Sequence, residues 1–155
     1  MQKNNAICEY YSLSFSELNP TQQKLVEEAK SATSRSYSPY SHFSVGAAVL
    51  LDNDAIVSGS NQENIAYPSG LCAERTAMFS ANSQYPDSAP VAIAIAAFNN
   101  GAFTDQPITP CGACRQVLIE SEQRFHHQIE VLLYGEKQIL LVKNISSLLP
   151  LSFDF

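Results

Sequence analysis

Three cysteines and one glutamate are the residues of this 155-residue chain whose types and spacing suggest chemistry. Cys72 is followed two residues later by Glu74, and Cys111 and Cys114 form a Cys-x-x-Cys pair directly after Pro110. Three thiolates can hold a zinc ion whose fourth position stays open for water, and a nearby carboxylate can transfer protons. These residues therefore predict a zinc site that hydrolyses a small molecule.

The position of each cysteine relative to its helix decides whether the thiols can meet. Side chains three residues apart on a helix, as Cys111 and Cys114 are, project about 60° from one another and can reach one ion. Pro110 favours a helix start here, where free N–H groups and the helix dipole stabilise thiolates. Cys72 and Glu74 would point to nearly opposite sides of a helix interior. Both can serve one site only if Cys72 begins its helix.

Simpler roles exist for the same residues. A Cys-x-x-Cys pair can be a redox pair, and a zinc site closed by a fourth ligand is purely structural. The candidates for a fourth ligand are Cys8, His42, His126 and His127, none of which has the spacing of a metal motif. Glu74 alone could form a surface salt bridge, and Cys8 is interpreted as a bystander. Cys72-x-Glu74 together with Pro110 favours the open zinc site, and Arg75 beside it could hydrogen-bond a cysteine sulfur.

Length and composition limit the class of protein. A chain of 155 residues can bury one core and is short for two domains. Apolar runs such as 91–98 are far below the ~18 residues that cross a bilayer, and the N-terminus lacks signal-peptide features. We therefore expect a cytoplasmic protein without a membrane partner. The net charge is −6 and the basic residues are scattered, which argues against nucleic acid because phosphate binding needs a positive patch.

Apolar periodicity and turn residues predict the elements that must position the site. Residues 1–18 are polar and patternless, so we expect a loosely ordered extension followed by a single domain over 19–155. Helices are predicted over 20–33, 71–82, 111–124 and 144–149, and strands over 45–51, 55–60, 91–98, 129–134 and 138–142. The apolar run 91–98 indicates a central strand that is buried on both faces. This order predicts an α/β fold, a three-layer α/β/α sandwich with a five-stranded mixed sheet.

Several stretches carry a resemblance to a known family. They are 40–48 (YSHFSVGAA), 61–64 (NQEN) with Tyr67-Pro68, 72–77 (CAERTA), 110–116 (PCGACRQ), and 148–150 (LLP) with Phe153. Together they resemble the cytidine deaminases, and in particular the small homotetrameric type that binds zinc through three cysteines. The resemblance runs from about residue 20 to 153, and cysteine at position 72 is typical of the branch that acts on free nucleosides. It implies a cytidine deaminase-like fold, one zinc ion per subunit, and a homotetramer with shared active sites.

The resemblance also implies a role for each matching residue. The zinc ligands would be Cys72, Cys111 and Cys114. Glu74 would carry protons between water, the pyrimidine N3 and the departing ammonia as cytidine and deoxycytidine become uridine and deoxyuridine in pyrimidine salvage. Substrate contacts would come from Phe43, Asn61, Glu63, Tyr67, Ala73 and Phe153. Among these, Asn61 and Glu63 would hold the ribose hydroxyls, and Phe153 would reach a neighbouring subunit's site.

Some features depart from the pattern of the family or leave alternatives open. Ser44 stands where proline is usual, and the loop 99–109 is longer than usual. Another aminated heterocycle such as blasticidin S is an alternative substrate, although Asn61 and Glu63 favour a ribosyl ligand. A zinc protein that binds nucleosides without turnover is a second alternative, against which Glu74 argues.

Overall fold

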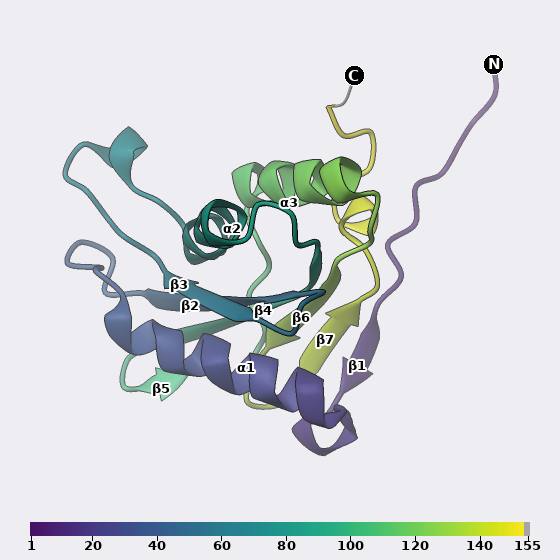
Figure 1. The fold of residues 1–155 in the computed structure, drawn as a ribbon. Helices are drawn as coiled ribbons and strands as arrows, with labels where there is room; N and C mark the ends of the chain where they lie inside the picture. The colour runs from purple at the N-terminus through teal and green to yellow at the C-terminus, as the bar shows by residue number, and fades with distance from the viewer. Residues whose placement is uncertain (154–155) are drawn as a thin grey trace.

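One mixed sheet between two layers of helices forms the body of the protein in the computed structural model, of which we describe residues 1–153 (Figure 1). The helices are α1 (Pro20–Ala32), α2 (Ala73–Gln84) and α3 (Gly112–Phe125), with short 3-10 turns η1 (Phe15–Glu17), η2 (Thr33–Arg35), η3 (Tyr67–Ser69) and η4 (Ile145–Ser147). The strands are β1 (Tyr11–Leu13), β2 (Ser44–Leu51), β3 (Ile56–Ser60), β4 (Pro90–Asn99), β5 (Ala102–Phe103), β6 (Glu130–Tyr134) and β7 (Ile139–Val142). The predicted α/β/α sandwich is confirmed, with α1 on one face and α2 and α3 on the other.

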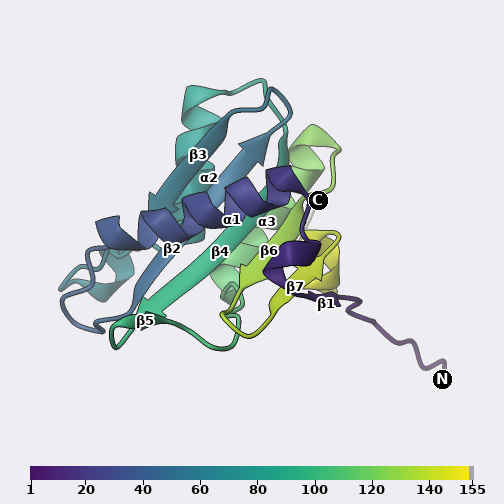
Figure 2. The same cartoon turned by 90° about the horizontal axis from the view of Figure 1, so that it is seen from below.

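The central position of β4 explains its apolar sequence. The strands run in the order β1-β7-β6-β4-β2-β3, with β4 and β6 parallel and the other neighbours antiparallel. Ile93 and Ile95 of β4 pack in the core cluster under α2 and α3. Ala94 and Ala96, which alternate with them, pack in the cluster under α1. Small side chains on that face leave room for α1, which crosses the sheet (Figure 2).

Within residues 1–153 the sheet has seven strands, so the predicted number of five is wrong. β1 lies within the segment 1–18 and pairs with β7 through three residues, too few to show an alternating pattern. β5 lies within the loop 99–109 and pairs with the end of β4. Asn100 and Gly101 between them have positive φ angles of 53° and 82°, as a type I′ hairpin turn requires. This Asn-Gly turn was a usable sequence signal, and the hairpin occupies the extra length of the loop.

Lys30 of α1 contacts aromatic rings of η1, β5 and β6. Its Nζ lies 5.2 Å from the ring centroid of Phe103 in β5, 4.9 Å from that of Tyr134 in β6 and 6.0 Å from that of Phe15 in η1. Glu27, one turn earlier, forms an ion pair with Lys30 at 2.9 Å. Cation–π contacts of this kind attract the ammonium to all three rings. The additional strand β5 is therefore tied to α1 as well as to β4.

Candidate active site

The N-termini of α2 and α3 bring the three cysteines together. Cys72 is the N-cap of α2 and Cys111 the N-cap of α3, both with extended backbone (ψ 155° and 168°). Neither side chain caps its own helix, so both thiols are available to a ligand. The Cys72 Sγ lies 4.0 Å from the Cys111 Sγ, which lies 3.6 Å from the Sγ of Cys114 in the first turn of α3. The prediction that Cys72 begins its helix is confirmed.

The spacing of the three sulfurs fits a single zinc ion. All three Sγ atoms lie within 4.8 Å of one another. A tetrahedral ion with Zn–S bonds of about 2.3 Å separates its sulfurs by about 3.8 Å. Cys114 is buried while Cys111 is exposed, so the cluster lies at the surface end of the core. Within residues 1–153 no histidine or carboxylate joins this group, which leaves the fourth position to water or substrate.

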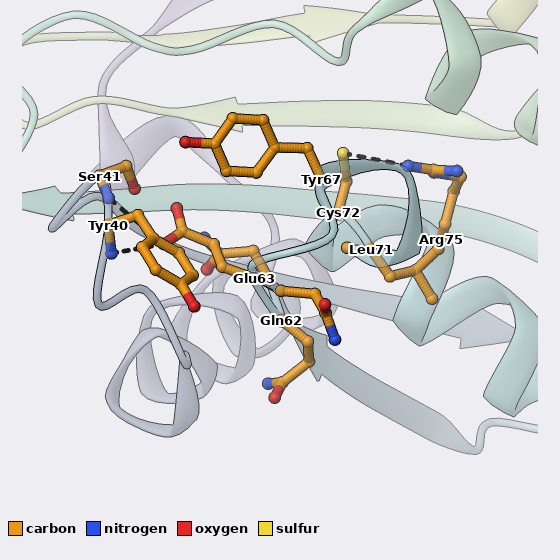
Figure 3. A pocket seen from close by; sticks show the side chains of 11 residues that line it. Tyr40, Ser41, Gln62, Glu63, Tyr67, Leu71, Cys72 and Arg75 are labelled. Atoms are coloured by element: carbon orange, nitrogen blue, oxygen red, sulfur yellow. Dashed lines mark hydrogen bonds between the residues drawn. The ribbon is translucent and has the colours of Figure 1, made fainter.

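Hydrogen bonds adjust the charge of the cysteine cluster. The Arg75 Nη2 donates to the Cys72 Sγ at 3.5 Å, so the contact that the sequence suggested is present (Figure 3). Hydrogen bonding from Cys114, and then from Arg75, lowers the pKa of the Cys72 thiol to about 5. The same hydrogen bond to Cys72 raises the pKa of the Cys114 thiol. The guanidinium therefore stabilises negative charge on a ligand, as residues around a metal centre commonly do.

Glu74 lies in the first turn of α2, where it is only 5% exposed. Its burial excludes the alternative of a surface salt bridge. Removal from water raises the pKa of the Glu74 carboxyl, and the nearby Cys72 sulfur adds to this effect. A buried carboxyl with a raised pKa holds a proton more readily than an exposed one, which favours proton transfer to a substrate. Glu74 therefore has the electrostatic environment of a general acid and base.

A cavity of about 560 Å³ opens beside Cys72. Its lining includes Tyr40, Asn61, Glu63, Tyr67, Cys72 and Arg75. Figure 3 shows Cys72 and Arg75 at one end and Tyr40 and Ser41 at the other, with Glu63 near the latter pair. Residues from three separate stretches of the sequence thus form one pocket next to the cysteines. This volume is sufficient for a small organic ligand.

Glu63 is held at the far end of the cavity as a carboxylate. Its Oε2 accepts hydrogen bonds from the backbone N–H groups of Tyr40 at 2.9 Å and Ser41 at 3.2 Å. A hydrogen bond from the Ser41 side chain, together with these two amides, lowers the pKa of Glu63. The side chain therefore carries a negative charge at neutral pH and can accept further O–H donors from a ligand.

Asn61 connects three chain segments before any ligand arrives. Its Oδ1 accepts hydrogen bonds from the Val45 N–H at 2.8 Å and from the Ser36 hydroxyl at 2.5 Å, and its Nδ2 donates to the Phe43 carbonyl at 2.9 Å. Both lone pairs of the amide oxygen are thus used, while one hydrogen on Nδ2 remains. Within this pocket Asn61 can therefore act toward a ligand only as a donor.

Ser44 belongs to the same hydrogen-bonded region. Its hydroxyl lies 3.3 Å from the Ser38 hydroxyl, which lies 3.1 Å from that of Ser36. Ser36 has a single hydroxyl hydrogen, and the shorter contact, to Asn61, is the one that takes it. A serine at position 44 therefore adds a side-chain contact to this loop that proline could not make.

The remaining predicted substrate residues do not line this cavity. Phe43 is half-buried against the core, and Ala73 is completely buried at the start of α2. Phe153 is 69% exposed, and its carbonyl accepts a hydrogen bond from the Gln116 Nε2 at 3.1 Å. Tyr40, to which the sequence assigned no role, meets Tyr67 edge to face with ring centroids 6.4 Å apart. Two aromatic residues in separate loops have no common sequence pattern, so this pair was not predicted.

An α/β/α sandwich with three thiols and a buried glutamate at two helix N-termini defines a zinc hydrolase of the deaminase class. Residues 19–126 match the family model described as the cytidine and deoxycytidylate deaminase zinc-binding region, and the chain belongs to this family. No helix within residues 1–153 has the length and apolar character needed to span a membrane.

Known proteins of this class are similar along most of their length. The chain is 46% identical over 98 residues to a cytidine deaminase of Halalkalibacterium halodurans, which covers 63% of this chain and 70% of that protein. It is 47% identical over 98 residues to one of Sporosarcina psychrophila, covering 63% and 68%. The crystal structure of a Burkholderia pseudomallei cytidine deaminase superposes with a TM-score of 0.71 at 39% identity, covering 84% of this chain and 97% of that one. The cytidine deaminase of Mycobacterium tuberculosis gives 0.68 at 30% identity, covering 86% and 98%.

Proposed function

We propose that this protein is a zinc-dependent deaminase that converts cytidine and deoxycytidine to uridine and deoxyuridine with release of ammonia. The observation that carries the proposal is the buried Glu74 beside three thiols whose spacing fits one zinc ion. Membership of the cytidine and deoxycytidylate deaminase family supports the same reaction. The relatives described above are cytidine deaminases, which also supports this reaction.

Each residue at the metal site has a role that follows from its side-chain chemistry. Cys72, Cys111 and Cys114 would hold the zinc ion, which when bound supplies a Lewis acid that makes water a nucleophile near neutral pH. Glu74 would accept the proton of the attacking water and pass it to N3 of the pyrimidine. The same carboxylate would then take the proton of the new C4 hydroxyl and give it to the departing amino group, which leaves as ammonia. Arg75 would offset the negative charge of the three thiolates through its hydrogen bond to Cys72.

Asn61 and Glu63 are suited to one kind of group, a sugar hydroxyl. The spare hydrogen of Asn61 Nδ2 can be donated to the hydroxyl oxygen, and the Glu63 carboxylate can accept the hydroxyl hydrogen. A carboxylate at this place also repels a 5′-phosphate that comes close. These two residues therefore favour a free nucleoside over a nucleotide. Tyr67, which lines the cavity, would form its edge. Phe43 and Ala73 lie outside the lining of this cavity, and we propose that they contact the base in the substrate complex.

The proposal extends to assembly and biological role. We propose a homotetramer with shared active sites, in which the exposed Phe153, which does not line the pocket of its own subunit, is available to reach that of a neighbour. In that arrangement Phe153 would contact the substrate of a neighbouring subunit. We propose a cytoplasmic role in pyrimidine salvage, carried by the domain over residues 19–155, to which residues 1–18 add an N-terminal extension that supplies the edge strand β1.

Ammonia release from cytidine by the zinc-loaded protein tests the reaction. The variant Glu74→Gln is expected to keep its zinc and to lose about 10²–10⁴-fold in turnover, because it cannot carry a proton. Near wild-type turnover in that variant would contradict the role of Glu74. A substrate panel of cytidine, deoxycytidine, cytidine 5′-monophosphate, blasticidin S and adenosine separates the alternatives. Turnover of blasticidin S alone would favour that substrate, and binding of nucleosides without turnover would favour a non-catalytic protein.

A further inference from the structure

Arg115 at the start of α3 joins two segments that are far apart in the sequence. Its Nε donates to the carbonyl of Pro110 at 2.8 Å, and its Nη1 donates to the carbonyl of Leu148 at 2.7 Å. Pro110 is buried and directly precedes Cys111, one of the three cysteines of the metal site. The donors of a guanidinium point in fixed directions in one plane. A guanidinium held by two carbonyls therefore fixes the position of each relative to the other.

Leu148 is the C-cap of η4, and the C-terminal segment begins after it. Leu148 itself is buried in the core, whereas Phe153 is exposed. Gln116, the residue after Arg115, donates from its Nε2 to the Phe153 carbonyl at 3.1 Å. The segment 148–153 is thus attached near both ends to consecutive residues of α3, and it lies beside this helix (Figure 1).

We propose that Arg115 is a positioning residue that couples the metal centre to the C-terminal segment. Its hydrogen bond to the Pro110 carbonyl fixes the position of the backbone before Cys111. Its hydrogen bond to the Leu148 carbonyl fixes the start of the segment that carries Phe153. This coupling rests on the proposed function in one respect, namely that Phe153 contributes to a neighbouring subunit's active site. On that basis, one guanidinium aligns a zinc ligand of its own subunit with a substrate contact of the next.

Arg115→Met removes every donor while keeping an unbranched side chain. In the Co²⁺-loaded protein, the visible absorption bands that report thiolate geometry are expected to shift, and Co²⁺ affinity is expected to fall on the order of ten- to a hundredfold. Hydrogen exchange at the backbone amides of residues 149 and 151–153 should become faster. Gln116→Ala is the matched control, because the Gln116 side chain donates a hydrogen bond to the Phe153 carbonyl, whereas Arg115 also holds the carbonyl before Cys111. It should speed that exchange and leave the cobalt spectrum unchanged.

Steady-state kinetics test whether Arg115 and Phe153 affect substrate binding through the same C-terminal segment. Arg115→Met and Phe153→Ala are each expected to raise the KM for cytidine, and Arg115→Met is expected to lower kcat in addition through Cys111. In the double variant Arg115→Met/Phe153→Ala, the fold-increase in KM should be smaller than the product of the fold-increases of the two single variants. Both substitutions act on KM through the same C-terminal segment. An unchanged cobalt spectrum in Arg115→Met, or KM effects that multiply, would overturn the coupling.

Two further comparisons keep the test decisive. If Arg115→Met does not fold, Arg115→Lys keeps the charge but lacks the planar fork that spans both carbonyls, so the cobalt spectrum or the exchange of 149–153 should still change. If neither changes, the coupling is wrong. If the wild-type protein releases no ammonia from cytidine, the proposed function fails, whereas the spectrum and the exchange rates continue to test the coupling itself.

Discussion

Replacing Gly59 with alanine is expected to destabilise the protein through a contact that the structure defines. Gly59 lies in β3 under α2, and a Cβ placed there would be 2.5 Å from the backbone nitrogen of Ala77 and 3.0 Å from its Cα. Both atoms belong to the helix backbone, so no side-chain rotation can relieve the contact. The helix and strand must separate by about 1 Å to restore ordinary van der Waals distances. Overpacking of this kind costs about 1–3 kcal/mol.

The same displacement should reach the metal centre. α2 begins directly after Cys72, so movement of the helix shifts this thiol relative to Cys111 and Cys114. A shift of about 1 Å is large compared with a Zn–S bond of about 2.3 Å. The stability lost by Gly59→Ala should therefore be greater in the presence of zinc than after its removal, because weaker zinc binding adds to the cost of overpacking.

Urea unfolding with and without zinc, at one protein concentration, measures both effects. Gly112→Ala is the matched control, since a Cβ at Gly112 would meet no atom within 4 Å. Alanine is favoured over glycine in a helix by up to about 1 kcal/mol, so the control should be as stable as the wild type or slightly more stable. Wild-type stability of Gly59→Ala would refute the inference that β3 and α2 are in direct backbone contact at this position.

Three other predictions concern charged groups and the metal. Hydrogen bonding from Ser41 lowers the pKa of Glu63, so this carboxylate contributes stability above its ordinary value of 4.5 and loses it as the pH falls through the folded value. The difference in melting temperature between wild type and Glu63→Gln should be constant from about pH 7 to 5 and should narrow below 4.5; a difference unaffected by acid would contradict this. Lys30→Met should lower the free energy of unfolding in urea by about 1–2 kcal/mol, because Lys30 lies over three aromatic rings. The exposed Lys24 of the same helix is the control, and an equal loss in Lys24→Met would show that the rings are not responsible. Chelation should lower the melting temperature and added zinc should restore it, whereas Cys114→Ser should respond to neither; a wild-type melting temperature independent of zinc would contradict the metal site.

The sequence predicted the structure best where a feature depends on residues that are close together in the chain. Asn19 and Pro20 predicted the start of α1, and Asn19 accepts a hydrogen bond from the Gln22 N–H at 2.9 Å as an N-cap. The incompatibility of Cys72 and Glu74 on one helix interior predicted that Cys72 precedes its helix, as it does. Local rules of this kind need no knowledge of the partner segment.

Prediction was weakest where short segments depend on distant partners. β1 and β5 contain three and two residues, so neither has room for an alternating pattern, and each exists because a longer strand beside it supplies hydrogen bonds. The amide of Asn61 is similar, because its three hydrogen bonds go to residues 16 to 25 positions away. Its limitation to a donor role toward a ligand could be derived only once those partners were known.

By itself the sequence determined the chemical capacity of this protein. Three thiols and a carboxylate, each placed by the rules of helix starts, specify a zinc site with an open position, and these rules act over a few residues. Only the tertiary structure decided that the site is assembled and how it is supported. The Cys72 and Cys111 sulfurs are 39 residues apart in the chain and 4.0 Å apart in space because the sheet brings two helix N-termini together. The burial of Glu74 and the bridge made by Arg115 arise from the same long-range packing, which no local pattern encodes.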